Sequence, residues 1–387
     1  MPAIIEPDMR AAARAADAGR EPLYDLDDAA RAAEKLLSGP VLDFVQGGSG
    51  REDSLRANRA ALDSTFVLSR VLRGSGEPDT RAHPLDTPTA MPIAVAPMAY
   101  QRLIHREGEL GTARAAKEAG VPFVVPMLSS VAVEQFAGDG GTRWFQLYPL
   151  RDRGLLGELI DRAKAAGCTA LMLTADVPRM GRRLRDLRNA FALPADVRAV
   201  HLDEADARAA QLGSRGRSAV AVHTRQAFDP GFGWTGLEWL RDRTDLPVVV
   251  KGILDPRDAV IAASLGARAV VVSNHGGRQL DGALPGFSAL PEVRDVVGAS
   301  CEVWVDGGFR SGGDLLKALA CGVSLVLIGR PVLWGLAVAG AAGVREVLTL
   351  LRAELEDAMA LCGCATVAEA ARLRVVREPW LRREEHR

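Results

Sequence analysis

The chain has 387 residues, of which 48 are Lys or Arg and 49 are Asp or Glu, so its formal net charge is −1. This balance argues against a nucleic-acid-binding protein, which would carry a basic face or stripe. Hydrophobic residues make up 48% of the chain, enough for a large core, but no run of about 18 apolar residues predicts a membrane span. The N-terminal stretch lacks the apolar region of a secretory signal. We therefore expect a cytoplasmic protein with neither a membrane nor a nucleic acid as partner.

Five cysteines are scattered through the chain, an odd number that does not indicate a disulfide framework and fits a reducing compartment. Cys362 and Cys364 are separated by one glycine, but no second Cys/His cluster accompanies them. We therefore expect no metal site.

Short runs rich in Val, Ile and Leu alternate along the chain with amphipathic segments. The predicted strands are 92–97, 122–125, 143–148, 170–174, 247–250, 269–273, 302–306 and 324–329, and helices are expected at 109–119, 155–166, 256–265 and 312–321. Runs that are apolar throughout indicate a parallel sheet covered on both faces. Eight such units predict an α/β fold of the (β/α)₈ (TIM) barrel type. A doubly wound sheet is the alternative, but it usually stops at about six strands.

The segments outside the repeating units suggest one domain with additions. Residues 1–22 are expected to form a loose arm, 23–90 a helical cap, 23–375 a single barrel domain and 376–387 a charged tail. A long insertion, about 177–245, follows the fourth strand. Insertions of this kind form lids or substrate-binding loops, and we expect part of the patternless stretch 203–217 to be mobile.

Polar and glycine-rich residues follow nearly every predicted strand, at the end of the barrel where active sites lie. They are Pro97, Met98, Ala99, Tyr100, Gln146, Tyr148, Thr174, Asp176, Lys251, Ser273, Asn274, His275, Asp306, Gly307, Gly308, Gly329 and Arg330. Folding alone does not need this combination, so it predicts an active site.

Two loops after the last strands, 306–313 and 329–331, predict a phosphate site. Glycine backbones allow an anion to approach, and Arg310 and Arg330 can bind it. Glycines that merely make tight turns are the alternative. The position after strands seven and eight, where barrels hold phosphate, favours the anion site.

His275 directly follows a buried strand, and Asp176 ends another strand. A carboxylate beside an imidazole fixes its tautomer and raises its basicity, which suits a general base, although a lone histidine is more often structural. Arg183 and Arg278 can grip a carboxylate. The neighbours Arg182, Arg185 and Arg188 are expected to be a solvated helix face.

The sequence resembles the FMN-dependent α-hydroxy-acid oxidases and dehydrogenases over roughly residues 23–372. The segments that carry the resemblance are 145–148, 174–178, 181–183, 250–252, 273–281 and 306–310. It implies that His275 removes a proton from the substrate, that Arg183 and Arg278 hold its carboxylate, that Tyr148 lies near the reacting hydroxyl and that Asp176 orients His275.

The resemblance also implies the residues that hold FMN. Lys251 would lie beside the flavin N1/O2 edge, where its charge stabilises the anionic reduced form. Pro97, Met98, Ala99, Gln146, Thr174 and Ser273 would contact the ring system, and Asp306, Gly307, Gly308, Arg310, Gly329 and Arg330 the ribityl phosphate.

Two departures from the glycolate oxidase pattern concern the substrate pocket. Phe44 stands where that branch has a tyrosine, and Met127 and Leu128 replace polar and aromatic residues. The segments 43–50, 96–101 and 181–189 instead resemble the actinobacterial 4-hydroxymandelate oxidases, although Arg179 and Met127 depart from that branch as well. We therefore expect Phe44, Met127 and Leu128 to line an apolar substrate pocket.

Together these features predict oxidation of an aryl (S)-2-hydroxy acid, mandelate or 4-hydroxymandelate, to the 2-keto acid, with O₂ as acceptor and H₂O₂ as product. The family implies a homotetramer. The main alternative is a dehydrogenase of the same family with another acceptor or an aliphatic substrate. Two other interpretations explain the sequence less well. In a type 2 isopentenyl diphosphate isomerase, His275, Arg183 and Arg278 would have no explained role. In an inactive flavin-binding protein, the presence of the complete catalytic set would be unexplained.

Overall fold

The computed structural model describes residues 22–202, 218–299 and 301–377. The expected arm up to residue 21, the stretch 203–217 expected to be mobile and the tail from residue 378 lie outside the described residues.

Eight parallel strands close into a barrel, because β2 pairs with β9 as well as with β3. The strands are β2 (Ile93–Val95), β3 (Phe123–Val125), β4 (Arg143–Leu147), β5 (Ala170–Thr174), β6 (Val248–Ile253), β7 (Ala269–Val272), β8 (Glu302–Asp306) and β9 (Leu325–Ile328). Each lies at a predicted apolar run, and almost all their residues are buried. The predicted TIM barrel is confirmed, and the doubly wound alternative is wrong.

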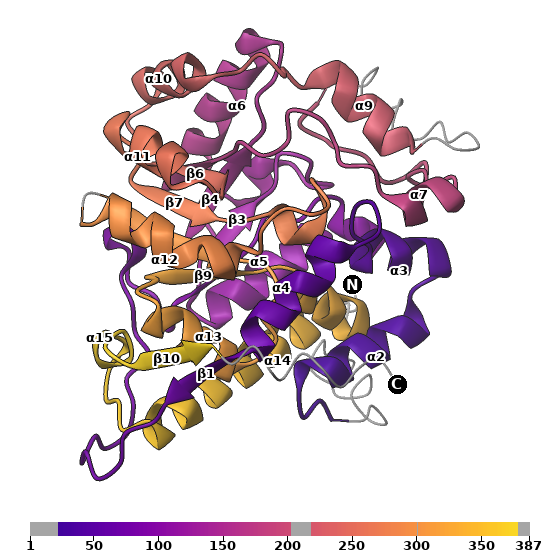
Figure 1. Ribbon diagram of the computed structural model, residues 1–387. Helices are drawn as coiled ribbons and strands as arrows, with labels where there is room; N and C mark the ends of the chain where they lie inside the picture. The colour runs from indigo at the N-terminus through magenta and orange to yellow at the C-terminus, as the bar shows by residue number, and fades with distance from the viewer. Residues whose placement is uncertain (1–21, 203–217, 300, 378–387) are drawn as a thin grey trace, which may run out of the picture.

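Helices surround the barrel (Figure 1). They are α5 (Gly108–Glu118), α6 (Arg153–Ala165), α10 (Trp234–Arg243), α11 (Pro256–Ser264), α12 (Gly286–Val297), α13 (Gly312–Ala320) and α14 (Arg330–Leu361). Among the described residues, α14 alone is long and apolar enough to cross a membrane by length and composition. It bends at Ala339 and Gly340, and it packs against α5 and against α2 (Leu26–Leu36), as a core helix does.

Side chains fill the barrel interior and leave no pore. The indole rings of Trp144 and Trp304 stack with centroids 4.9 Å apart. Small and branched residues from the other strands complete this inner cluster, and Leu85, from the short helix Pro84–Asp86, joins it. Because the interior is packed, the chemistry is confined to the open end of the barrel.

The N-terminal cap consists of α2, α3 (Gly39–Gln46) and α4 (Asp53–Asp63). It is followed by β1 (Thr65–Leu68), which pairs antiparallel with β10 (Arg374–Arg377), and a short helix, α15 (Val367–Ala370), precedes β10. Sequence analysis missed this sheet. The charged tail expected from 376 overlaps β10, which ends at Arg377.

The insertion after β5 contains α7 (Leu184–Arg188) and α9 (Ala219–Ala227). In Figure 1, α7 lies beside α3 of the cap, and these two helices pack together. His201 ties the insertion to the loop after β3. Its Nδ1 lies 2.9 Å from the carbonyl oxygen of Met127, and its Nε2 accepts a hydrogen bond from the Val133 N–H. The insertion and the cap therefore meet at the mouth of the barrel.

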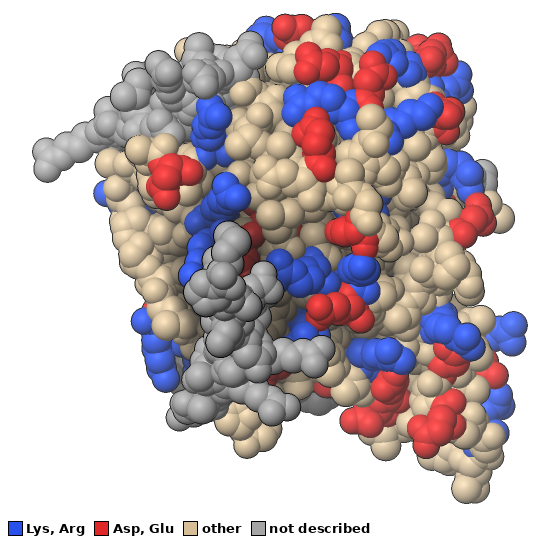
Figure 2. Space-filling model, turned by 180° about the vertical axis from the view of Figure 1, so that it is seen from behind, with Lys and Arg blue, Asp and Glu red and all other residues tan. Residues whose placement is uncertain are grey.

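Acidic and basic side chains are mixed over the face shown in Figure 2. This mixing agrees with the near-zero net charge of the whole chain.

Candidate active site

A cavity of about 180 Å³ opens at the C-terminal ends of the barrel strands. Its walls come from three parts of the chain: the strand ends, the cap and the insertion. The lining includes Phe44, Pro97, Met98, Ala99, Tyr100, Leu128, Tyr148, Thr174, Val177, Met180, Arg183, Val220, Thr224, Phe228, Lys251, His275, Arg278, Asp306, Gly307, Gly308, Arg310, Gly329 and Arg330. The structure thus brings most of the predicted site residues into one cavity.

His275 lines this cavity and pairs with Asp176, which lies behind the lining. Nδ1 of His275 lies 3.0 Å from Oδ1 of Asp176, so Nδ1 carries a proton and Nε2 is left to accept one. Burial acts to raise the pKa of Asp176, but His275 and then Lys251 outweigh it, and the pKa lies below its ordinary value. Asp176 is therefore an ionised partner that orients a basic imidazole.

The backbone is shaped to allow this pair. Gly252 has a φ of +105°, and a Cβ atom there would lie 2.6 Å from the Asp176 Cβ. His275 itself has a φ of +57°, and its N–H donates to the Ser273 hydroxyl over 2.9 Å. Strain of this kind persists only where the surroundings fix it, as they do at functional sites.

Lys251 is buried at the end of β6, where an unpaired ammonium would be costly. Its Nζ lies 2.8 Å from Oδ2 of Asp306 and donates to the Ser273 hydroxyl over 2.9 Å. Burial acts to lower the pKa of Lys251, but Asp306 and Asp176 outweigh it and raise it. The cavity therefore holds a fixed positive charge at this point.

Arg183 and Arg278 both lie near the ring of Phe44. Their guanidinium carbons are 5.9 Å and 5.4 Å from the centroid of its ring. Burial lowers the pKa of both arginines. At Arg278 the neighbouring Arg183 lowers the pKa further, whereas at Arg183 the nearby Asp186 partly offsets the effect of burial. The nearest carboxylate oxygen to Arg183 belongs to Asp186, 4.0 Å away. Two buried guanidinium groups with so little counter-charge suit an anionic ligand.

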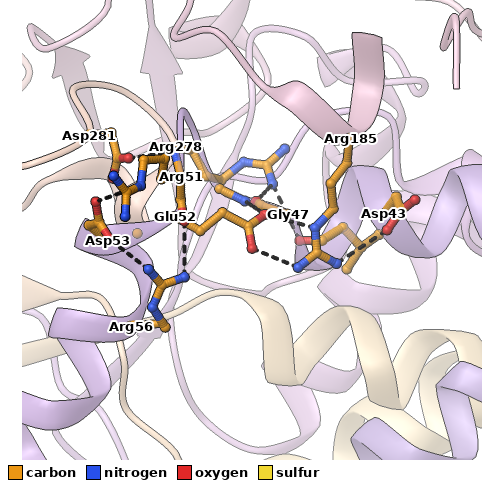
Figure 3. A network of polar contacts seen from close by, with 12 residues as sticks. Asp43, Gly47, Arg51, Glu52, Asp53, Arg56, Arg185, Arg278 and Asp281 are labelled. Carbon is orange, nitrogen blue, oxygen red and sulfur yellow. Dashed lines mark hydrogen bonds and ion pairs between the residues drawn. The ribbon is translucent and has the colours of Figure 1, made fainter. Parts of the chain in front are cut away.

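A polar network anchors these arginines to the cap (Figure 3). Arg278 donates to the Gly47 carbonyl oxygen over 2.6 Å. Arg185 binds both carboxylate oxygens of Glu52, each over 2.7 Å, and also reaches Asp43 over 3.2 Å. The expectation that Arg185 belongs to a solvated helix face is wrong. Since Arg183 precedes α7 directly, Arg185 holds that helix, and Arg183 with it, against the cap.

Arg310 and Arg330 lie at the predicted phosphate site. Among the described residues no carboxylate lies within ion-pair distance of either, and Arg330 donates instead to the carbonyl oxygens of Val45, Gly47 and Gly276. Burial together with a neighbouring arginine lowers the pKa of Arg310 to about 10 and that of Arg330 to about 9. An anion placed between these cations would relieve both effects.

The glycines of the predicted phosphate loop permit a close backbone approach. Gly308 has a φ of +92°, and a Cβ atom there would lie 2.7 Å from the Asn58 carbonyl oxygen. The orphaned Oδ1 of buried Asp306 provides a free acceptor beside this loop. These groups together fit FMN. Its phosphate would need the two unneutralised arginines and the bare glycine backbone, its ring edge the charged lysine, and its ribityl hydroxyls the free carboxylate oxygen.

Four predicted site residues do not line the cavity, namely Met127, Gln146, Ser273 and Asp176, the last of which contacts His275 from behind the lining. Met127 is buried and does not line the cavity; its N–H donates to Gln146 over 3.1 Å, and Leu128 alone of the pair faces the cavity. Gln146 and Ser273 are buried behind the lining. Gln146 donates to Thr174 over 3.1 Å and Ser273 accepts from Lys251, so both position residues that reach the cavity. Arg179 is exposed and is not part of the lining.

Sequence analysis missed several lining residues from the insertion. Val220 and Thr224 from α9 and Phe228 just after it face the cavity, and Phe191 stacks on Phe44 with centroids 4.6 Å apart. The four-residue spacing of 220, 224 and 228, which marks one face of a helix, was an available signal. Tyr100 was placed at a strand end but given no role.

Comparison with known proteins shows the family to which the chain belongs. The sequence model of the family described as FMN-dependent dehydrogenase matches residues 33–377. The chain belongs to this family. FMN is therefore its cofactor.

Relatives within the FMN-dependent dehydrogenase family are hydroxy-acid oxidases. A 4-hydroxymandelate oxidase from Amycolatopsis orientalis is 54% identical over 348 residues, which cover 90% of this chain and 97% of that protein. An L-lactate oxidase from Nostoc sp. is 44% identical, over 87% of this chain and 93% of its own. A solved structure of mandelate oxidase with (S)-4-hydroxymandelic acid is 53% identical, with a TM-score of 0.90, over 92% of this chain and 99% of its own. The chain is thus an enzyme of the FMN-dependent hydroxy-acid oxidase type, as the resemblance implied.

Proposed function

We propose that this enzyme oxidises an aryl (S)-2-hydroxy acid, mandelate or 4-hydroxymandelate, to the corresponding 2-keto acid. The observation that carries the proposal is that the ring of Phe44 lies close to both Arg183 and Arg278. A carboxylate held by the two arginines lies next to an apolar wall formed by Phe44, Leu128, Val177, Met180, Val220 and Phe228. A substrate ring has apolar surface to bury there, whereas glycolate and lactate have little.

The chain's own residues account for binding and proton transfer. Arg183 and Arg278 hold the substrate carboxylate, and Tyr148 donates a hydrogen bond near the reacting hydroxyl. Burial raises the pKa of Tyr148, with Asp176 adding to the effect, so this hydroxyl stays protonated. His275, held by Asp176, takes up a proton through Nε2 as the C–O single bond becomes a carbonyl. FMN, when bound, would supply the two-electron acceptor, and Lys251 would supply a fixed positive charge that favours the transfer.

The proposed electron acceptor is O₂, which takes up the two electrons with two protons and leaves as H₂O₂. The relatives named above are oxidases, and the small side chain of Ala99 lines the cavity. The cytoplasmic location and the homotetramer stay predictions.

A product assay tests the proposal. We expect the purified FMN enzyme, given (S)-mandelate in air, to form benzoylformate and H₂O₂ in a one-to-one ratio. Benzoylformate formed only when an artificial acceptor is added, with reduced flavin persisting for minutes in air, would instead make the enzyme a dehydrogenase. A flavin that is not bleached anaerobically by either aryl acid would contradict the proposed substrate class.

A further inference from the structure

Tyr100 faces the substrate end of the cavity from the loop after β2. Its backbone adopts a left-handed conformation with a φ of +57°, and its N–H donates to the Leu128 carbonyl oxygen over 3.1 Å. The side chain is 1% exposed and lines the same cavity as Phe44 and Tyr148. Its position is therefore fixed by the backbone, next to the apolar loop that carries Leu128.

The phenolic oxygen of Tyr100 is buried and has no hydrogen-bond partner among the described residues. Burial raises the pKa of Tyr100, and the nearby Tyr148 adds to this effect while Arg183 opposes it. The hydroxyl is therefore a protonated group that can both donate and accept one hydrogen bond.

The polar groups common to all 2-hydroxy acids already have partners. Arg183 and Arg278 serve the carboxylate, and Tyr148 and His275 serve the hydroxyl that reacts. The remaining wall is mostly apolar, with Leu128, Val177, Met180, Val220 and Phe228, and its hydroxyl group at Thr224 already donates to the Ala221 carbonyl oxygen over 3.2 Å. An unsatisfied hydroxyl in such a wall is destabilising, and phenylalanine at position 100 would avoid that cost.

We propose that Tyr100 is a specificity-determining residue that hydrogen-bonds a hydroxyl group on the ring of the substrate. This inference rests on the proposed function, which puts an aryl ring against the apolar wall. A site built to pair with a substrate hydroxyl rejects the analogue that lacks it, because its own polar group is then left unpaired. The enzyme should therefore prefer 4-hydroxymandelate to mandelate, and Tyr100 should be the source of that preference.

The test compares Tyr100→Phe with the unmodified enzyme on (S)-mandelate and (S)-4-hydroxymandelate. We expect the ratio of kcat/KM for 4-hydroxymandelate to that for mandelate to fall by roughly tenfold or more, with mandelate turnover kept or improved. The flavin absorbance change on titration with 4-hydroxybenzoylformate and with benzoylformate gives a second readout that does not depend on turnover. The dissociation constant should rise for the hydroxylated product alone.

The chain offers matched controls because it has three tyrosines. Tyr24→Phe alters a side chain that is 77% exposed and should leave the ratio unchanged. Tyr148→Phe should lower turnover of both acids alike.

An equal loss for both acids in Tyr100→Phe, or an unchanged ratio, would overturn the assignment of Tyr100. The proposed function itself fails on a different result. In that case the unmodified enzyme turns over lactate with the same efficiency as the better aryl acid. The two failures are therefore distinguishable.

Discussion

Asp176 and His275 are 99 residues apart in the chain, yet the carboxylate Oδ1 of one lies 3.0 Å from the imidazole Nδ1 of the other. The pair forms because β5 and β7 end at the same rim of the barrel and because Gly252, on the strand between them, leaves room for the aspartate. This contact defines which ring nitrogen of His275 can act as a base.

Replacing His275 removes the base without touching the phosphate site. We expect His275→Ala to retain FMN but to lose on the order of 10²–10⁴-fold in the rate of anaerobic flavin reduction by substrate, the range for a positioned general base. Stopped-flow absorbance measures this step apart from the reaction with oxygen. His83→Ala, at an exposed position, is the control. Near-normal reduction in His275→Ala would show that the base lies elsewhere.

Asp176→Asn tests the electrostatic part of the pair. The pKa of Asp176 is lowered, so this carboxylate is the ionised partner of the imidazole. The asparagine variant removes the negative charge that stabilises the imidazolium formed when His275 takes up the substrate proton, so we expect the rate of anaerobic flavin reduction to fall at least tenfold. Stopped-flow absorbance measures this rate, and Asp161→Asn, an exposed carboxylate, should leave it unchanged. An unchanged rate in Asp176→Asn would contradict this account.

Arg330 is expected to act on FMN and not on the substrate. We expect Arg330→Ala to weaken FMN retention at least tenfold, because one charge-assisted contact to an anion contributes roughly 1.5–3 kcal/mol. Flavin content after gel filtration and a fluorescence titration of the apoprotein measure it. Arg51→Ala alters a side chain that is 86% exposed and serves as the control. Unchanged flavin affinity would remove Arg330 from the phosphate site.

Arg185 is a positioning residue, since it joins α7 to the cap through Glu52 and Asp43 (Figure 3). We expect Arg185→Ala to raise KM more than it lowers kcat, because Arg183 loses its support while His275 does not. Arg188→Ala, an exposed position on the same helix, is the control. Equal losses in kcat for Arg185→Ala and His275→Ala would contradict a role limited to positioning.

The parts of this molecule that sequence analysis predicted are those set by local pattern. Each barrel strand is an apolar run, and a strand's last residues must lie at the rim, so Asp176, Lys251, His275 and Arg330 could be placed together before their contacts were known. Pairing between β1 and β10 could not be predicted in this way, because Thr65 meets Arg377 across most of the chain. The orientations of Met127 and Leu128 were also beyond reach, since side-chain direction in an irregular loop follows no period. The contacts of Phe191 and Arg185 with the cap depend on how the insertion packs in three dimensions, which local sequence pattern does not predict.

The ratio of kcat/KM for (S)-mandelate and (S)-4-hydroxymandelate to that for (S)-lactate and glycolate, on one preparation, tests the central claim most directly. A ring that buries about 100 Å² against Phe44, Leu128 and Phe228 gains about 2–3 kcal/mol at about 25 cal/mol per Å². The account therefore predicts that the better aryl acid exceeds lactate and glycolate by roughly a hundredfold. Equal or higher values for lactate or glycolate would contradict the aryl pocket, although the chain would still belong to the FMN-dependent family.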